Sequence, residues 1–288
     1  MTGAGTVVAN GAELYHEVRG AGPTILFISG ATGDAGQWDA VADLLSDDYT
    51  VLTYDRRGNS RSPRPPAWGS APIGEQADDA AALLRALGLA PAIGYGSSQG
   101  AMVLTALVLR HPEVLSAAVF HEPPYAGALP AADEIRGGLQ QLVGAAMAEG
   151  GPALATERFL RWVGGDAAFE AIDPATRSRM LGNGEVLFGM EIGGVSAYLP
   201  AQQELAAVRT CCVVAAGAEH RAADAPFHWF HDASRWLADR LGAPLVELSG
   251  GHLPQLTCPQ ALAAELRDLC EQMRAFRTRG QESHFPAL

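Results

Sequence analysis

The stretch GYGSSQGAM, residues 94–102, places Ser98 at the centre of the pattern G-x-S-x-G. Residues 92–96 form a short apolar run, which is typical of a buried strand, and residues 99–111 form an apolar pattern of helical length. A strand, a sharp turn and a helix in this order force a strained turn that lifts the central hydroxyl clear of the backbone. The stretch therefore predicts an exposed serine nucleophile at the end of a strand.

The two glycines around the serine set its register. Gly96 and Gly100 suit the turn because side chains there would collide across it, and their spacing selects Ser98 rather than Ser97. The N-terminus of the following helix then points at negative charge that develops beside Ser98. The amide of Gln99, directly after the serine, is the first candidate to bind that charge.

The rest of the chain repeats the same alternation of elements. The runs with strand character are 24–29, 49–54, 92–96, 116–121, 211–217 and 244–250, and helical stretches include 75–88, 99–111, 231–242 and 259–273. Near-continuous apolar strands that alternate with helices predict a doubly wound, mostly parallel α/β sheet covered on both faces. Residues 6–18 carry an Asn-Gly turn between two alternating runs, which predicts an antiparallel hairpin before the sheet.

One interval interrupts this alternation. Residues 123–205 contain no convincing strand, so we expect a helical lid inserted after the sixth strand, with the core formed by 1–122 and 206–276 and a loosely held tail at 277–288. Aromatic and Met side chains in such a segment are typical of an ordinary core and also of a ligand wall. The side chains assigned to substrate binding under the lid hypothesis are Trp162, Phe188, Met190 and Tyr198.

Composition excludes several classes of function. A net charge of −12 and a pI near 5.0 argue against nucleic acid and anionic membranes as partners. The sequence contains no Lys, which excludes Schiff-base lysine chemistry, and no Cys or His spacing suits a metal, so we expect neither cofactor nor metal. No stretch resembles a signal peptide or a membrane span, and a reduced cytoplasmic protein is expected.

A serine hydroxyl needs a base and an oxyanion site. His252 lies in a Gly-rich loop between the last apolar strand and the last helix, and it is the candidate base. Backbone amides must bind the charge of a tetrahedral intermediate. Besides Gln99, the candidates are Gly30 and Ala31 after the strand 24–29, where small residues let the backbone approach a substrate.

The acid that orients the histidine has three candidates. Glu122 follows the strand 116–121, at the carboxyl end where open sheets place catalytic groups, and Pro123-Pro124 would stiffen its exit. Glu219 and Asp224 lie after the strand 211–217 and remain alternatives. An ordinary strand end exposed to solvent is the plain interpretation of Glu122.

The order of turn, inserted segment and late histidine resembles that of the α/β-hydrolase superfamily over nearly the whole chain. HEVRGAGPTILFISGATGD, TYDRRGNSRS, GSSQGA and VFHEPP are similar to the group that contains zearalenone lactonase. In most members of this fold the acid follows the strand after the lid, at the position of His220 here. In the lactonase group it is a Glu after the strand that follows the turn. The resemblance thus implies Ser98 as nucleophile, Glu122 as acid and His252 as base, with the oxyanion site near Gly30 and Gln99.

These observations predict a serine hydrolase for a carboxylic ester or lactone of a largely apolar small molecule. Hydrolysis of carbon–carbon bonds and acyl transfer can use the same triad, and a small-molecule binding protein can keep the same fold. The lid matches no known motif, so the resemblance does not identify the substrate. The oligomeric state is equally open.

Overall fold

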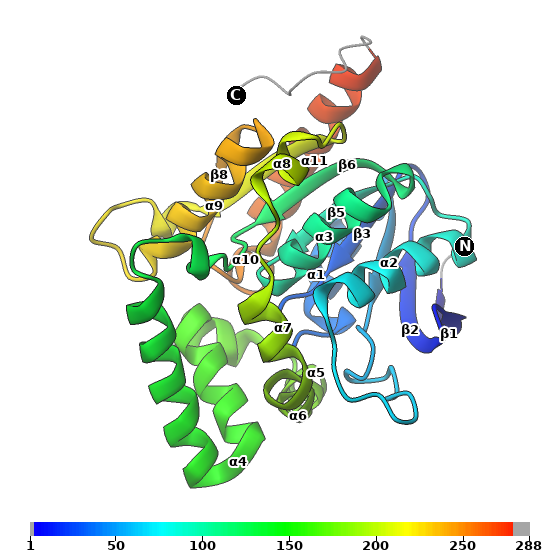
Figure 1. The fold of residues 1–288 in the computed structure, drawn as a ribbon. Coiled ribbons are helices and arrows are strands. Elements are labelled where there is room, and N and C mark those ends of the chain that lie inside the picture. The colour runs from blue at the N-terminus through cyan, green and yellow to red at the C-terminus, as the bar shows by residue number, and fades with distance from the viewer. Residues whose placement is uncertain (1–2, 279–288) are drawn as a thin grey trace.

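The computed structural model describes residues 3–278 as an α/β domain (Figure 1). Eight strands of this part of the chain form one sheet in the order β1-β2-β4-β3-β5-β6-β7-β8. Pairs that involve β2 are antiparallel, and all the others are parallel. The strands are β1 Gly3–Ala9, β2 Ala12–Arg19, β3 Thr24–Ile28, β4 Thr50–Tyr54, β5 Ala92–Ser97, β6 Leu115–His121, β7 Cys211–Gly217 and β8 Leu245–Leu248. The predicted mostly parallel sheet is confirmed.

The first two strands form the hairpin expected from the Asn-Gly turn. Asn10 and Gly11 join β1 to β2 and both have positive φ, at 48° and 73°. This is the backbone that a two-residue hairpin loop requires, because its twist matches that of the strands.

Helices cover both faces of the sheet. Alternate strand residues such as Leu26 and Leu52 pack with α2 (Ile73–Leu87), α3 (Gln99–Arg110) and α9 (His228–Leu241). Their neighbours, such as Ile25 and Val51, pack on the other face with α1 (Asp39–Leu45) and α11 (Pro259–Thr278). Both faces are thus buried, which explains the unbroken apolar runs of the strands.

Residues between β6 and β7 are mostly helical and project beyond one end of the sheet (Figure 1). They form α4 Ala132–Ala171, α5 Pro174–Gly182, α6 Gly184–Val186, a π-helical turn Leu187–Glu191, α7 Ile192–Ala197 and α8 Gln202–Ala206. Two glycines with positive φ, Gly151 and Gly165, interrupt α4. We call residues 123–205 the helical insertion. Its position after the sixth strand is as expected, and its role as a lid stays a prediction.

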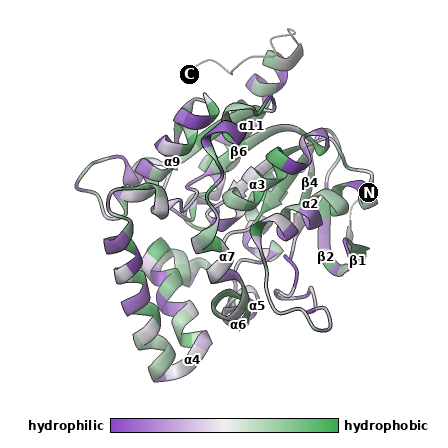
Figure 2. Cartoon of the chain, in the orientation of Figure 1, coloured by the Kyte–Doolittle hydropathy of each residue, from purple (hydrophilic) through white to green (hydrophobic). Residues whose placement is uncertain are grey.

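The central sheet and α4 of the helical insertion differ in hydropathy. In Figure 2 the central strands are mostly green, whereas α4 carries alternating purple and green surfaces. Within the described residues, no helix combines the length and apolar character needed to cross a bilayer. The predicted tail at 277–288 lies largely outside the described residues.

Candidate active site

Ser98 sits in a strained turn between β5 and α3. Its backbone has φ 55° and ψ −125°, a region that non-glycine residues rarely adopt. A Cβ on Gly96 would lie 2.4 Å from the carbonyl oxygen of Gly100, and one on Gly100 would lie 2.1 Å from that of Ile28. Both positions therefore require glycine, and the turn presents Ser98 as the sequence predicts.

Strand register brings the next candidate beside it. The amide of Ser98 donates to the carbonyl oxygen of His121, and the amide of Glu122 donates to that of Ala215, at 2.8 and 3.0 Å. The carboxyl ends of β5, β6 and β7 thus lie side by side, with Ser98 and Glu122 directly beyond them. Glu122 also has positive φ, 47°, and its side chain is fully buried. It is not a solvated strand end.

Glu122 contacts the candidate base. Its Oε2 lies 2.7 Å from Nδ1 of His252, which is 3% exposed in the loop after β8. The two alternative acids, Glu219 and Asp224, are exposed. Their loop runs over the surface after β7, whereas Glu122 points inward from a central strand. Among the described carboxylates, Glu122 is the one hydrogen-bonded to His252.

Glu122 has two further partners. Nδ1 of His220 lies 2.7 Å from Oε1, and the amide of Gly217 donates to the same oxygen at 2.8 Å. Burial alone would raise the pKa of Glu122, but the hydrogen bonds from His220 and His252 outweigh it and hold the pKa well below its usual value. The carboxylate is ionised at neutral pH.

That charge determines the histidine tautomers. An ionised carboxylate only accepts hydrogen bonds, so Nδ1 of His252 and Nδ1 of His220 both carry hydrogen. A neutral His252 then has its lone pair on Nε2, the atom that a general base needs. The ring of Phe230 stacks on both imidazoles, with centroid distances of 4.0 Å to His252 and 5.8 Å to His220. Sequence reasoning missed the role of His220, although its place at the usual acid position was a signal.

A pocket joins the candidate residues. It encloses about 340 Å³, including open space at its mouth, and both Ser98 and His252 line it. Gly30 and Ala31 line it as well, and a Cβ on Gly30 would lie 3.6 Å from Oγ of Ser98. Gln99 is the first residue of α3, where amides have no partner within the helix. The candidate oxyanion donors therefore surround the serine.

The helical insertion forms one wall of this pocket. Its contributing side chains are Phe159, Leu160, Val163 and Met180, with Leu253 and Gln255 opposite them near His252. The four side chains expected from sequence, Trp162, Phe188, Met190 and Tyr198, do not line it. Trp162 packs edge-on against Phe227, with 4.9 Å between the ring centroids, and Tyr198 packs against Tyr125, with 6.5 Å between the ring centroids. On α4, residues 159, 163 and 160 span an arc of about 100° that faces the pocket, and Trp162 lies about 60° beyond its edge, on the side of Phe227.

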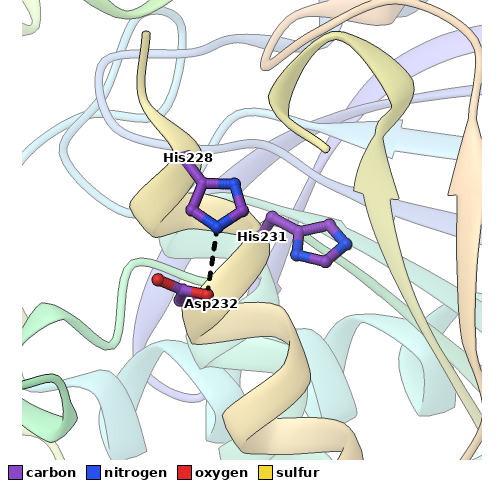
Figure 3. Close-up of side chains that lie close together, drawn as sticks. All are labelled: His228, His231 and Asp232. Atoms are coloured by element: carbon purple, nitrogen blue, oxygen red, sulfur yellow. Dashed lines mark ion pairs between the residues drawn. The ribbon is translucent and has the colours of Figure 1, made fainter. Parts of the chain in front are cut away.

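A separate group of side chains on α9 has metal-ligand character. Potential ligand atoms of His228, His231 and Asp232 all lie within 4.8 Å of one another (Figure 3). Nε2 of His228 lies 3.4 Å from Oδ1 of Asp232, as an ion pair at i, i+4 spacing. Burial and then the charge of Arg235 lower the pKa of His231, and that positive charge also opposes a bound cation. We therefore treat this group as a surface ion pair and assign it no metal.

The sequence of this chain is similar to those of known hydrolases. The sequence model of the α/β hydrolase fold family matches residues 23–160. An uncharacterized hydrolase of Bacillus subtilis, YraK, is 29% identical over 283 residues, covering 93% of this chain and 96% of that protein. The zearalenone hydrolase of Bionectria ochroleuca is 30% identical over 118 residues, covering 40% of this chain and 45% of that protein.

Solved structures show the same fold. A thermophilic esterase from Thermogutta terrifontis superposes with a TM-score of 0.75 at 21% identity and covers 94% of this chain and 99% of its own. Est816, described as an N-acyl homoserine lactone degrading enzyme, gives 0.68 at 23% identity, covering 92% and 99%. At these identities the likeness establishes the fold alone, and the predicted fold is confirmed.

Proposed function

We propose that this chain is a serine hydrolase of the α/β-hydrolase superfamily and that it acts on a carboxylic ester or lactone of a largely apolar small molecule. The observation that carries the proposal is the 2.7 Å contact between Glu122 and Nδ1 of His252, with His252 and Ser98 on one pocket. This contact leaves Nε2 of a neutral His252 free to accept a proton.

The reaction follows from these roles. Oγ of Ser98 attacks the carbonyl carbon while Nε2 of His252 takes the hydroxyl proton, and the carbonyl electron pair moves onto oxygen. The amides of Gln99 and of Gly30 or Ala31 bind this oxyanion. The intermediate collapses, the carbon–oxygen bond to the alcohol breaks, and His252 returns its proton to the leaving oxygen. Water then attacks the acyl-enzyme carbonyl and gives a proton to His252. The bond between the acyl carbon and Oγ of Ser98 breaks, Oγ takes the proton from His252, and the carboxylic acid leaves.

Glu122 stabilises the charged intermediate states. When His252 holds the transferred proton it is a cation, and the ionised carboxylate at Nδ1 offsets that charge in a buried setting. Because Glu122 stays ionised well below neutral pH, this support is available at every pH at which His252 can act as a base.

The pocket wall supports an apolar substrate. Phe159, Leu160, Val163, Met180 and Leu253 present apolar surface beside Ser98. Four of them belong to the helical insertion, which we propose acts as a lid. The zearalenone hydrolase, 30% identical over 118 residues, is named for a small-molecule substrate, and this likeness supports the small-molecule part of the proposal.

The test is acylation of Ser98. With p-nitrophenyl butyrate we expect a burst of nitrophenolate equal to the enzyme concentration, followed by steady turnover. A fluorophosphonate should add one label per chain, located at Ser98 by peptide mass analysis. Ser98→Ala should lose turnover by several orders of magnitude, retaining only the contributions of binding and the oxyanion site, about 10³-fold over water.

The matched control is the neighbouring hydroxyl. Ser97 also borders the pocket but lies in β5, so Ser97→Ala should keep the burst. An inactive Ser97→Ala together with an active Ser98→Ala would show that Ser97, and not Ser98, is the nucleophile. Tight binding of an ester without any burst or label would instead indicate a binding protein.

A further inference from the structure

A buried ion pair connects the helical insertion to the sheet beneath it. Glu191 ends the π-helical turn of the insertion, and Arg56 lies in the loop after β4. Both side chains are 1% exposed. Nη1 of Arg56 donates to Oε1 of Glu191 at 2.5 Å, and Nη2 donates to Oε2 at 3.2 Å. The guanidinium thus binds both carboxylate oxygens across 135 positions of sequence.

Each end of this pair also contacts one of the two segments proposed to bind the oxyanion. Nη2 of Arg56 donates to the carbonyl oxygen of Gly30 at 3.1 Å. Oε2 of Glu191 accepts from Nε2 of Gln99 at 3.0 Å. The Arg56–Glu191 ion pair is therefore hydrogen-bonded both to Gln99, the residue after Ser98, and to Gly30 in the loop after β3.

The contact with Gly30 fixes a specific peptide plane. In a trans peptide the carbonyl of one residue and the amide of the next point in opposite directions. Arg56 holds the carbonyl of Gly30, so the amide of Ala31 is directed away from Arg56. Of the two donor candidates in this loop, this favours the Ala31 amide, since Ala31 lines the pocket beside Ser98.

Stability alone is a poor reason for such a pair. Removing two charges from water costs several kcal/mol per ion, and well-packed apolar residues are often as stable as a buried ion pair. This pair needs further polar partners, with Gln76 accepting from Arg56 at 2.5 Å and Asn59 donating to Glu191 at 3.2 Å. Nε of Arg56 still has no hydrogen-bond partner. The arrangement gives up stability but fixes the orientation of the groups it touches.

We propose that Glu191 and Arg56 are positioning residues that make the oxyanion site depend on the docked helical insertion. With the insertion in place, the pair holds the Gly30–Ala31 peptide and Gln99. Without Glu191, Arg56 loses the carboxylate that aligns its guanidinium, and Gln99 loses its acceptor. The insertion thereby links its own closure over the pocket to the formation of the oxyanion site. This rests on the proposed serine hydrolase function.

The first test replaces Glu191 by Gln. A Gln side chain has one acceptor oxygen, so it cannot bind Arg56 and Gln99 as the carboxylate does. Removal of a whole oxyanion donor costs about 10²–10³-fold in kcat. A misaligned donor should cost less, so we expect kcat for p-nitrophenyl butyrate to fall about 10- to 100-fold, with KM within about threefold. A trifluoromethyl ketone, whose adduct with Ser98 carries an oxyanion, should bind more weakly by the same factor as kcat/KM falls.

The matched control is a second buried pair of the same kind. Oδ2 and Oδ1 of Asp79 accept hydrogen bonds from Arg57 at 2.8 and 2.5 Å, and both side chains are buried. Among the described residues, their further hydrogen-bond and ion-pair partners are Asn10 and Glu75, and neither side chain bonds to Gly30 or Gln99. Asp79→Asn should lower thermal stability as Glu191→Gln does, but leave kcat and ketone binding within about threefold of wild type. Equal effects of the two variants on kcat would overturn the proposal.

A double variant separates charge balance from positioning. Arg56→Met with Glu191→Gln removes both charges, so stability should recover relative to Glu191→Gln alone. Positioning requires that kcat does not recover, because the carbonyl of Gly30 then keeps only the amide of Gly33 as a donor, at 3.3 Å, and lacks the guanidinium. Recovery of kcat to within about threefold of wild type would mean that the pair matters only for folding.

Two further outcomes are distinguishable. If Glu191→Gln does not fold, Arg56→Lys keeps the buried charge but lacks the fork that reaches Glu191 and Gly30 together, and the same loss of kcat and ketone binding is expected from it. If wild type shows no burst and no label at Ser98, the proposed function fails and this inference fails with it. A wild-type burst with unaltered kinetics in Arg56→Lys overturns this inference alone.

Discussion

Nδ1 of His220 lies 2.7 Å from Oε1 of Glu122, the carboxylate oxygen that His252 does not use. In most proteins with this fold, the triad acid lies at the position that His220 occupies here. In this chain that position instead holds a donor to an acid on the neighbouring strand. Both oxygens of Glu122 are therefore hydrogen-bonded, and its orientation toward His252 is fixed from two sides.

Replacing His220 by Phe should weaken but not abolish activity. Phe keeps the ring that stacks on Phe230 and removes the donor to Oε1, while the Gly217 amide still binds that oxygen. We expect kcat to fall by about tenfold or less, which corresponds to roughly 1.4 kcal/mol of transition-state stabilisation. Steady-state kinetics with p-nitrophenyl butyrate checks this. A loss as large as that of Glu122→Gln would show that His220 acts in the reaction itself.

Replacing Glu122 by Gln should have a much larger effect. The amide keeps the volume of the side chain but loses the negative charge that stabilises protonated His252, and it favours the wrong tautomer. By analogy with other triads, kcat should fall about 10³–10⁴-fold. Pre-steady-state acylation rates give the measurement. The controls are Glu219→Gln and Asp224→Asn, which should each cost less than about tenfold; a larger loss in either would move the acid role to that residue.

His121 should make stability depend on pH. Burial lowers the pKa of its imidazole from 6.5 to about 4, and the nearby His252 and His220 act in the same direction against the opposing charge of Glu122. Between these two pKa values the unfolded chain binds more protons than the folded one, so stability rises with pH. From pH 7 to about 4 this group should remove on the order of 3 kcal/mol of stability.

The measurement compares wild type with His121→Phe by urea unfolding at pH 7.5 and pH 5. Above pH 4.5 Glu122 contributes its full stabilisation in both proteins, because its lowered pKa affects stability only below that value. His231, whose pKa is also lowered, is common to both and cancels. Wild type should lose more stability than the variant on acidification. Equal losses would contradict the burial of a neutral His121.

The pocket wall should determine preference for the acyl chain. Phe159 lines the pocket, whereas Trp162 on the same helix packs against Phe227. Phe159→Ala should change KM for p-nitrophenyl hexanoate several-fold more than for the acetate, because the shorter chain does not reach the insertion. Trp162→Ala should leave that ratio near the wild-type value. The opposite pattern would show that Trp162 faces the substrate after a rearrangement.

Local pattern was sufficient for much of the fold and for part of the site. The hairpin at Asn10-Gly11, the alternation of strands and helices, and the turn around Ser98 each depend on residues a few positions apart. Their causes are backbone sterics and the two periods of side-chain orientation, which operate within one element. The sequence alone thus determined where the strands end and which serine is raised above them.

The contacts that complete the site join residues far apart in the chain. Glu122 and His252 are 130 positions apart, and Arg56 and Glu191 are 135. From sequence, three carboxylates were open partners for His252, and the choice among them depended on how β6 and β7 pair. Similarly, the helical period shows which residues of the insertion are neighbours on a helix but not which of them meet the pocket. Phe159 and Trp162 are only three positions apart, and the pocket is lined by Phe159 and not by Trp162. Only the tertiary structure decides such contacts, because they depend on how whole elements pack together and on burial that selects one partner among several of equal chemistry.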